Sequence, residues 1–290
     1  TNESERTRFI MIGGFLGAGK TTLIARLATE LVDEGFRVGL VTNDQAYNLV
    51  DTHTLRAQGF EVGEVPGACF CCKFDELVGT LTQLAEHERP HFIITEPVGS
   101  CTDLVATVLE PLRQLHGERY EVAPLIVLCK PEHGKKILAD SGQVGFSPQA
   151  AYIFLKQLEE ADIVVVNKVD KLSAAQTAEL VQLVERRFPG KNVVTASGLA
   201  GAGVAELRKL LSPRRATVPM EVDYEIYAAG EAELGWLNAT VDLRSNNARP
   251  FLLDNVVCEL VDRLAMALCE VGAEPAHLKV LGQAGNNVCV

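Results

Sequence analysis

The chain has 290 residues, 47% of them hydrophobic and 22% charged, which excludes wholesale disorder and allows a large buried core. It carries 38 acidic and 27 basic residues, and the net charge of -11 argues against nucleic acid or a membrane surface as its main partner. No apolar run approaches the roughly 20 residues that span a bilayer, and the polar N-terminus shows no secretory signal. Because eight cysteines are too sparse for a disulfide-stapled secreted domain, we expect a cytoplasmic protein.

Short runs rich in Val, Ile and Leu alternate with segments of helical periodicity as far as residue 211. The expected strands are 8–13, 37–42, 60–65, 91–95, 122–128, 162–166 and 192–195. The expected helices are 20–34, 75–87, 103–115, 148–160, 173–187 and 203–211. The polar, glycine-containing segment 130–147 is expected to be a loop or lid. This alternation predicts an α/β fold, a doubly wound and mostly parallel sheet with helices on both faces.

The pattern of expected strands and helices changes after residues 1–211, which are expected to form the main domain. Residues 212–219 carry two prolines and two arginines and are expected to form a linker. Beyond them, a strand at 235–243, a helix at 251–271 and a strand at 277–281 predict a small α+β unit over residues 220–290, with Trp236 as its core anchor. So small a unit is expected to dock on the main domain, and it ends so soon after its last strand that we expect it to be incomplete.

Residues 14–21, GFLGAGKT, match the pattern G-x-x-x-x-G-K-[ST] between the first expected strand and the first expected helix. The backbone N–H groups of such a loop surround and bind an anion at the N-terminus of a helix. Lys20 is expected to reach the β- and γ-phosphates of a nucleotide, and the Thr21 hydroxyl to ligate Mg²⁺. The loop residues expected at the phosphates are Gly14, Gly17, Ala18 and Gly19. The alternative is a glycine-rich turn without a ligand, which the agreement of pattern and context disfavours.

The sequence NKVD at residues 167–170 follows the expected strand 162–166. The Asp170 carboxylate can accept two hydrogen bonds from N1–H and the N2 amino group of guanine, a paired donor that adenine lacks. In isolation, four residues after a strand are better explained as a polar turn. In a chain with a phosphate loop they favour guanine, and Ser197 after the next strand is expected to add backbone contacts to the base.

Two carboxylates follow expected strands at the edge of the sheet where the phosphate loop lies, because ligands of parallel sheets bind beyond the carboxyl ends of the strands. Asp44 follows the second strand and Glu96 ends the fourth. Each is expected to hold Mg²⁺, directly or through water, or to orient the attacking water. Gly99 is expected to offer its N–H to the γ-phosphate as a nucleotide-sensing hinge. The alternatives are a turn cap for Asp44 and a solvated strand end for Glu96.

Cys69, Cys71 and Cys72 form a compact group after the third expected strand. Thiolates at this spacing suit Zn²⁺, Cu⁺ or Co²⁺ rather than Mg²⁺. Three sulfurs are one short of a closed structural site, so the fourth position is open to water, Glu64 or a partner's ligand, as a carrier that releases its metal requires. The alternatives are buried apolar cysteines and a redox pair. The group is expected at the same sheet edge as the phosphate loop, so the two sites can be coupled.

The order GGFLGAGKTT, Asp44, CFCC, Glu96 with Gly99, and NKVD resembles the CobW/HypB/UreG family of metal-associated P-loop GTPases, and its CobW-like branch most. The resemblance covers residues 8–211 and implies a doubly wound fold, slow GTP hydrolysis and a role in delivering metal to a metalloenzyme or a cobalamin pathway. It also implies phosphate and Mg²⁺ contacts from Thr22, guanine contacts from Asn167 and Lys168, and metal binding by the three cysteines. Ala68 before the cysteines and Pro97-Val98 after Glu96 depart from the family pattern and suggest a divergent subgroup.

The sequence therefore predicts a GTPase that binds GTP or GDP with Mg²⁺ and whose nucleotide state gates a Zn²⁺ or Co²⁺ site for a client metalloenzyme or cobalamin-pathway protein. Lys20, Asp44, Glu96 and Gly99 are the expected catalytic residues. No arginine finger is evident, so we expect a low basal rate, raised by a nucleotide-dependent homodimer or by the client. One alternative is a GTP-dependent chaperone whose cysteines dock the partner and carry no ion, and another is an ATP-using kinase. His53, His133 and His277 are weaker candidates for ligands.

Overall fold

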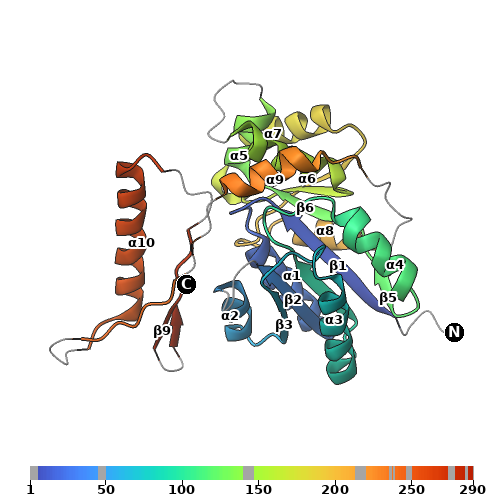
Figure 1. Ribbon diagram of the computed structural model, residues 1–290, viewed down its shortest axis with the longest axis horizontal. Helices are drawn as coiled ribbons and strands as arrows, with labels where there is room; N and C mark the ends of the chain where they lie inside the picture. The colour runs from blue at the N-terminus through green and yellow to red at the C-terminus, as the bar shows by residue number, and fades with distance from the viewer. Residues whose placement is uncertain are drawn as a thin grey trace.

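The structure is a computed structural model. It describes residues 6–44, 50–139, 147–212, 220–234, 237, 239–245, 250–273, 278–284 and 287–289. Most of the elements form one body around a central sheet, and one long helix with a short hairpin lies beside that body (Figure 1).

The central sheet has the strand order β3-β2-β4-β1-β6-β7-β8, with β5 also paired to β1, and all of these pairings are parallel. Its strands are β1 (Thr7–Gly14), β2 (Val38–Asp44), β3 (Val62–Pro66), β4 (Phe92–Glu96), β5 (Tyr120–Val122), β6 (Ile126–Cys129), β7 (Ile163–Val166) and β8 (Asn192–Thr195). The predicted doubly wound parallel sheet is confirmed.

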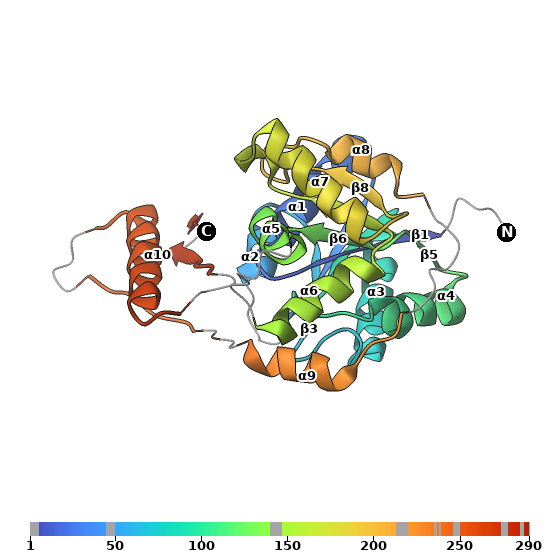
Figure 2. The ribbon, with the colours of Figure 1, turned by 90° about the horizontal axis from the view of Figure 1, so that it is seen from above.

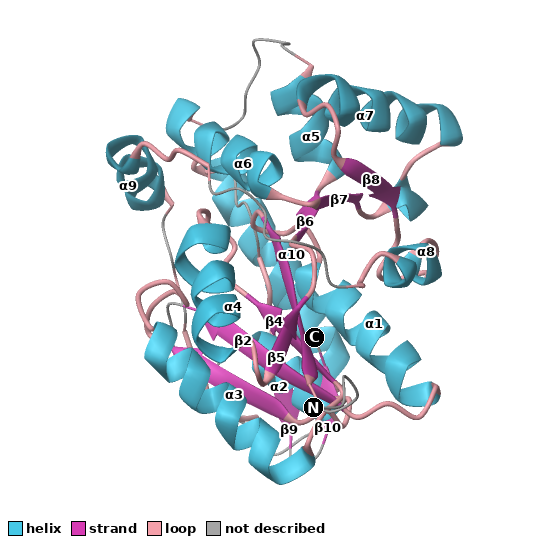
Figure 3. Ribbon diagram, turned by 90° about the vertical axis from the view of Figure 1, so that its right-hand side faces the viewer, coloured by secondary structure: helices cyan, strands magenta, loops and turns pink. Residues whose placement is uncertain are grey.

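Helices cover both faces of the sheet because its central strands are apolar on both sides. In β1, Phe9 and Met11 enter one buried core, and Ile10 and Ile12 enter the other. The helices on the Ile10 face are α1 (Lys20–Asp33), α2 (Val50–Ala57) and α8 (Val204–Lys209). Those on the Phe9 face are α3 (Phe74–Glu88), the π-helical turn η2 (Val105–Leu109), α4 (Glu110–His116), α5 (Pro131–Leu138), α6 (Pro148–Glu160) and α7 (Ala174–Arg187). Figure 3 shows the strands between α1 on one side and α3 and α4 on the other.

Three expectations for the main domain are wrong in detail. The single strand expected at 122–128 is two strands, β5 and β6, with Pro124 between them, where it cannot donate to a ladder. The segment 130–147, expected to be a loop, begins with helix α5. The glycine inside this helix, Gly134, favoured the loop prediction. A Cβ at Gly134 would lie 2.8 Å from Cys129 Sγ, so packing against the sheet explains the glycine. Helix α2 was not expected, and residues 140–146 of the predicted lid lie outside the described residues.

The chain after residue 219 differs more from expectation. Helix α9 (Tyr224–Glu233) was not predicted, and it packs lengthwise on α6 (Figure 2). Close packing explains Gly230, since a Cβ there would lie 2.8 Å from the Gln149 carbonyl oxygen. The strand expected at 235–243 is wrong for its described residues, because no partner strand covers them and Leu237 is 93% exposed. Trp236 and residues 213–219 of the predicted linker lie outside the described residues.

The helix expected at 251–271 is confirmed as α10 (Leu253–Glu270). The strand expected at 277–281 is wrong for residues 278–281, and the chain forms β9 (Gly282–Ala284) instead, paired antiparallel with β10 (Asn287–Cys289). Gly282 of this hairpin packs against Val257 and Leu253 of α10. The boundaries at 211 and 220 stay a prediction. Within the described part of the chain, no helix is both long and apolar enough to cross a membrane.

Candidate functional site

The loop between β1 and α1 carries its cation and hydroxyl toward the end of β4. The Lys20 ammonium donates to the Gly14 carbonyl at 3.1 Å and lies 3.9 Å from the Glu96 carboxylate. The Thr21 hydroxyl donates to the same carboxylate, Oγ1 to Oε1, at 3.2 Å. All three polar side chains are buried. Lys20, Thr21 and Glu96 are therefore brought together as the sequence predicts.

Gly19 has no room for a side chain. Its φ is +89°, and a Cβ would lie 2.7 Å from the Asn167 amide nitrogen. Gly99, in the loop after β4, is equally close to the phosphate loop. A Cβ there would lie 2.7 Å from Leu16 Cδ2 and 3.2 Å from the Lys20 ammonium nitrogen. The backbone at Gly99 is thus within reach of any group that Lys20 binds.

The NKVD residues pack against the phosphate loop from the end of β7. The Asn167 amide donates to the Ala18 carbonyl at 2.8 Å and accepts from the Gly198 N–H at 3.1 Å. The Lys168 ammonium donates to the Gly17 carbonyl at 2.8 Å, so its stem lies along the loop. Asn167 therefore links the phosphate loop to the 197–198 turn, and Lys168 contacts the loop at Gly17. The guanine contacts expected of these two residues stay a prediction.

Asp170 lies in the 3₁₀ turn η3 (Val169–Lys171) and accepts a hydrogen bond from the Ser197 hydroxyl at 2.5 Å. The Asp170 side chain is exposed, and Ser197 is fully buried. Ser197 therefore orients the carboxylate through its side chain, where the sequence suggested backbone contacts alone.

A cavity of about 360 Å³ opens beside the start of α1. Its lining includes Thr21 and Thr22 from α1, Gly198 from the 197–198 turn, and Lys279 from the segment before β9. Sequence reasoning did not single out Lys279. Asp44 pairs through its backbone with Pro66 of β3, and its side chain lies outside what the structure describes, so its magnesium role stays a prediction.

The three clustered cysteines lie on the turn between β3 and α3. Their sulfurs are within 4.8 Å of one another, with Cys69 to Cys71 at 2.6 Å, Cys69 to Cys72 at 3.3 Å and Cys71 to Cys72 at 3.9 Å. Among the described residues, this is the one group of three or more His, Cys, Asp or Glu that meets this distance. Glu64 is not part of it, and its carboxylate lies 4.0 Å from the Arg56 guanidinium.

Asn43, at the end of β2, fixes the cysteine turn. Its amide nitrogen donates to the carbonyls of Val65 at 2.7 Å and Ala68 at 2.6 Å, and its oxygen accepts from the Phe70 N–H at 2.9 Å. The side chain is 5% exposed, so all three bonds are shielded from water. The sequence did not predict this positioning role of Asn43.

The three clustered thiols influence one another's ionisation through hydrogen bonds between their sulfurs. Hydrogen bonds from the Cys101 and Cys71 thiols lower the pKa of Cys69 to about 2 against the opposing effect of burial. Donation to Cys69 raises the pKa of Cys71 and of Cys72 above the usual range of a thiol. The hydrogen bonds therefore favour the thiolate form at Cys69 and the thiol form at Cys71 and Cys72.

Of the three predicted histidine ligands, the two that the structure describes, His53 and His133, are not part of this cluster. His53 is exposed. His133 is 5% exposed and packs edge-on against Phe15 and Phe154, and burial lowers its pKa to about 4. It is a neutral core residue. His277 lies outside the described residues.

The parallel sheet, the loop with Lys20 at the N-terminus of α1 and the thiols at the same edge define a P-loop nucleotide-binding protein with a second, sulfur-lined site. The family model described as the CobW/HypB/UreG nucleotide-binding domain matches residues 8–195, and the chain belongs to that family. The predicted resemblance is thus confirmed.

The chain is similar to a zinc chaperone CobW from a Sinorhizobium species, 28% identical over 231 residues that cover 67% of this chain and 62% of the relative. It is also similar to the zinc chaperone YeiR from Escherichia coli K12, 29% identical over 188 residues that cover 62% of this chain and 51% of the relative. The chain thus spans between half and two thirds of the length of these curated relatives. Its fold resembles the crystal structure of HypB from Helicobacter pylori in complex with nickel, with a TM-score of 0.51, 19% identity, and coverage of 72% of this chain and 86% of that one.

Proposed function

We propose that this protein binds and hydrolyses GTP and that its nucleotide state controls a zinc site formed by Cys69, Cys71 and Cys72. The observation that carries the proposal is that two groups of functional side chains lie at the same edge of the sheet. One is the buried Lys20–Glu96 pair, and the other is the group of three cysteine sulfurs. The names of the two zinc chaperones support zinc as the cargo. A client metalloenzyme or cobalamin-pathway protein would receive the ion, and the cytoplasm is the expected location.

Hydrolysis would use side chains and backbone groups that lie in the phosphate loop or next to it. Lys20 binds the β- and γ-phosphates, while Thr21 and Glu96, 3.2 Å apart, suit a magnesium ion, which supplies positive charge beside the phosphates when bound. The Gly99 N–H would bind a γ-phosphate held by Lys20, and the proposal is supported by the 3.2 Å between a Cβ built at Gly99 and the Lys20 ammonium nitrogen. Attack by water in line with the leaving oxygen then needs little from the protein beyond positioning and charge.

Thiols suit zinc because the thiolate is a soft ligand, and a zinc–sulfur bond of about 2.3 Å places tetrahedral sulfurs about 3.8 Å apart. The sulfurs of the cluster lie 2.6 to 3.9 Å apart, so small side-chain rotations bring them to that spacing. Cys72 is exposed and Cys69 and Cys71 are half-buried, which leaves one side of the site accessible to a client.

The decisive experiment is a zinc titration of the full chain with GDP and with a non-hydrolysable GTP analogue. We expect one bound zinc whose affinity differs between the two nucleotides, and loss of that site in the variant C69S/C71S/C72S. The matched control is C258S/C269S, which removes two exposed cysteines of α10. If the triple variant binds zinc as tightly as the wild type, the carrier function is wrong, and cysteines that dock a partner become the better explanation.

Guanine specificity is expected to depend on Asp170. An Asp170→Ala variant should bind GTP about 100-fold more weakly, because two charge-assisted hydrogen bonds to the base are lost. Its affinity for ATP should not fall. Competition of GTP and ATP for a fluorescent GDP analogue measures both constants, and Asp242→Ala removes an exposed carboxylate as the control. Equal binding of ATP and GTP by the wild type would contradict the assignment and favour an ATP-using enzyme.

A further inference from the structure

The loop after β4 connects the two sites within three residues. Its Gly99 lies against the phosphate loop, where a Cβ would come within 3.2 Å of the Lys20 ammonium. Cys101 follows two residues later, a chain distance of at most about 7.6 Å between Cα atoms. Any displacement of Gly99 by a bound phosphate therefore reaches Cys101 through a short, direct segment.

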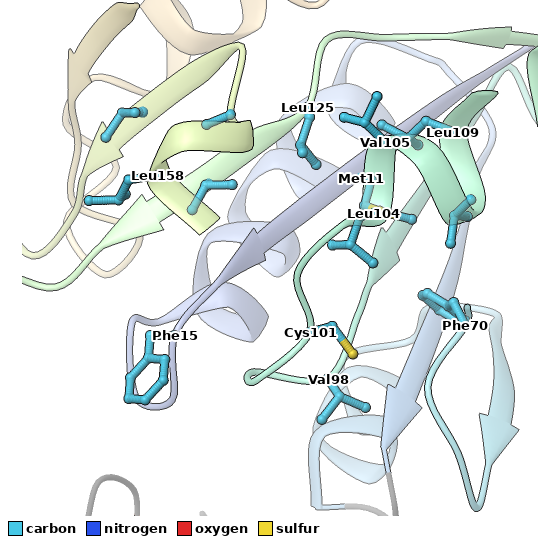
Figure 4. Packing of buried hydrophobic residues seen from close by; sticks show 14 of the residues in the cluster. Met11, Phe15, Phe70, Val98, Cys101, Leu104, Val105, Leu109, Leu125 and Leu158 are labelled. Atoms are coloured by element: carbon cyan, nitrogen blue, oxygen red, sulfur yellow. The ribbon is translucent and has the colours of Figure 1, made fainter. Parts of the chain in front are cut away.

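Cys101 is placed against the cysteine cluster. Cys69 and Cys71 pack against the apolar core that contains Cys101, and the Cys101 thiol is near enough to Cys69 to lower the pKa of Cys69. The side chain is 3% exposed and belongs to the same apolar core as Val98 and Phe70. Figure 4 shows Cys101 beside Val98, between Phe15 of the phosphate loop and Phe70 of the cysteine turn in that view.

The neighbouring strands explain this contact. β2 pairs with both β3 and β4, so the turns that follow β3 and β4 leave the sheet at one edge, separated by the end of β2. Cys101 approaches from the buried side, next to Cys69, while Cys72 faces solvent. The cluster thus has three sulfurs open to one side and a fourth thiol behind them.

We propose that Cys101 is the fourth thiolate ligand of the zinc site, and that the Gly99–Cys101 segment carries the nucleotide state to it. This inference rests on the proposed function. Cys101 is not one of the three sulfurs within 4.8 Å of one another, so it enters the site when its loop shifts toward Cys71 and Cys72. As the sulfur–zinc bonds form, each sulfur that is still a thiol releases its proton to solvent, and no oxidant or reductant takes part.

One side chain of α6 makes the segment move as a unit. The Gln157 amide nitrogen donates to the carbonyl of Gly99 at 3.0 Å and to that of Cys101 at 2.8 Å. Further along, the Asp103 carboxylate accepts a hydrogen bond from the Tyr224 hydroxyl of α9. Gln157 is 3% exposed, so its bonds are not exchanged readily with water. The two carbonyls are therefore bound by one amide group, so a shift of Gly99 that displaces this amide also displaces Cys101.

The test compares C101S with C129S, which changes another fully buried cysteine outside the cluster. Zinc affinity is measured by competition with a chromophoric chelator, in GDP and in a GTP analogue. We expect C101S to bind zinc at least about tenfold more weakly in the tighter state, as even outer-shell partners contribute about that much. The difference between the two nucleotide states should also disappear, with GTP binding and the C129S variant unchanged.

A measurement on the wild type does not depend on how C101S folds. With Co²⁺ in place of zinc, the sulfur-to-metal charge-transfer absorption per ion reports the number of thiolates, and X-ray absorption counts sulfurs around zinc directly. We expect four sulfurs in the tighter nucleotide state. Three sulfurs in both states, or equal zinc affinity in C101S and wild type, would overturn the role of Cys101 and leave the proposed function standing. A wild type that binds no zinc would overturn both.

Discussion

A Gly19→Ala variant is expected to fold but to bind GTP at least about 100-fold more weakly, a loss of about 3 kcal/mol in binding free energy. The added Cβ would lie 2.7 Å from the Asn167 amide nitrogen, which donates to the Ala18 carbonyl and so clamps the loop. Relief of this clash must move either the loop or Asn167, and either shift misplaces N–H groups that would face the phosphates. Isothermal titration with GDP and GTP measures the effect.

The chain offers a matched control for this substitution. Gly35 has φ +88°, almost the same as the +89° of Gly19, and a Cβ at Gly35 would meet nothing within 4 Å. Gly35→Ala therefore carries the same left-handed backbone cost, about 1–2 kcal/mol of stability, without the clash. We expect Gly35→Ala to bind nucleotide like the wild type. If both variants lose nucleotide equally, general destabilisation explains the loss and the clamp by Asn167 does not.

Replacing Glu160 with Gln is expected to flatten the dependence of stability on pH. Glu160 is 4% exposed, and burial raises its pKa to about 8, although its Oε1 accepts a hydrogen bond from the Val105 N–H at 2.5 Å. The folded-state pKa lies above the unfolded value near 4.5, so the unfolded state releases its proton first as pH rises. Stability is therefore lost between about pH 4.5 and pH 8.

The expected size follows from this window. Between pH 5.5 and 8.5, the wild type should lose about 3 kcal/mol of unfolding free energy through Glu160, and Glu160→Gln should not show this loss. Urea denaturation at the two pH values measures it, with Glu159→Gln, whose carboxylate is largely exposed, as the control. Identical pH profiles for wild type and Glu160→Gln would show that Glu160 does not titrate in this range. Because Glu160 binds the backbone at Val105, its ionisation also bears on the loop that carries Cys101.

The parts of the site that the sequence predicted are those formed by short, continuous segments of the chain. The phosphate loop, NKVD and the cysteine cluster each place their chemistry within eight residues, and the apolar strands order these segments along one sheet edge. That is why Lys20, Thr21 and Glu96 were predicted to meet, and they do. The doubly wound fold followed for the same reason, since the central strands are apolar on both faces.

What the sequence did not predict depends on contacts between distant segments. Cys101 was not among the predicted ligands, because its nearness to Cys69 depends on the strand order β3-β2-β4, which places the turns after β3 and β4 at one edge. The roles of Asn43 and Gln157 depend on which carbonyls fall within reach of one amide, and no local pattern encodes that. Helix α9 was not predicted because the helix it packs against, α6, lies some seventy residues earlier in the chain.

The exposure of the sulfurs also sets an order in which they can be exchanged. Cys72 faces solvent, Cys69 and Cys71 are half-covered, and Cys101 is enclosed. If a client takes the ion by substituting one ligand at a time, the Cys72 bond is the first that an incoming donor can replace, and the Cys101 bond is the last to break. Transfer would then proceed without free zinc in solution, and the rate of its final step would depend on how long the inner loop keeps its sulfur in place.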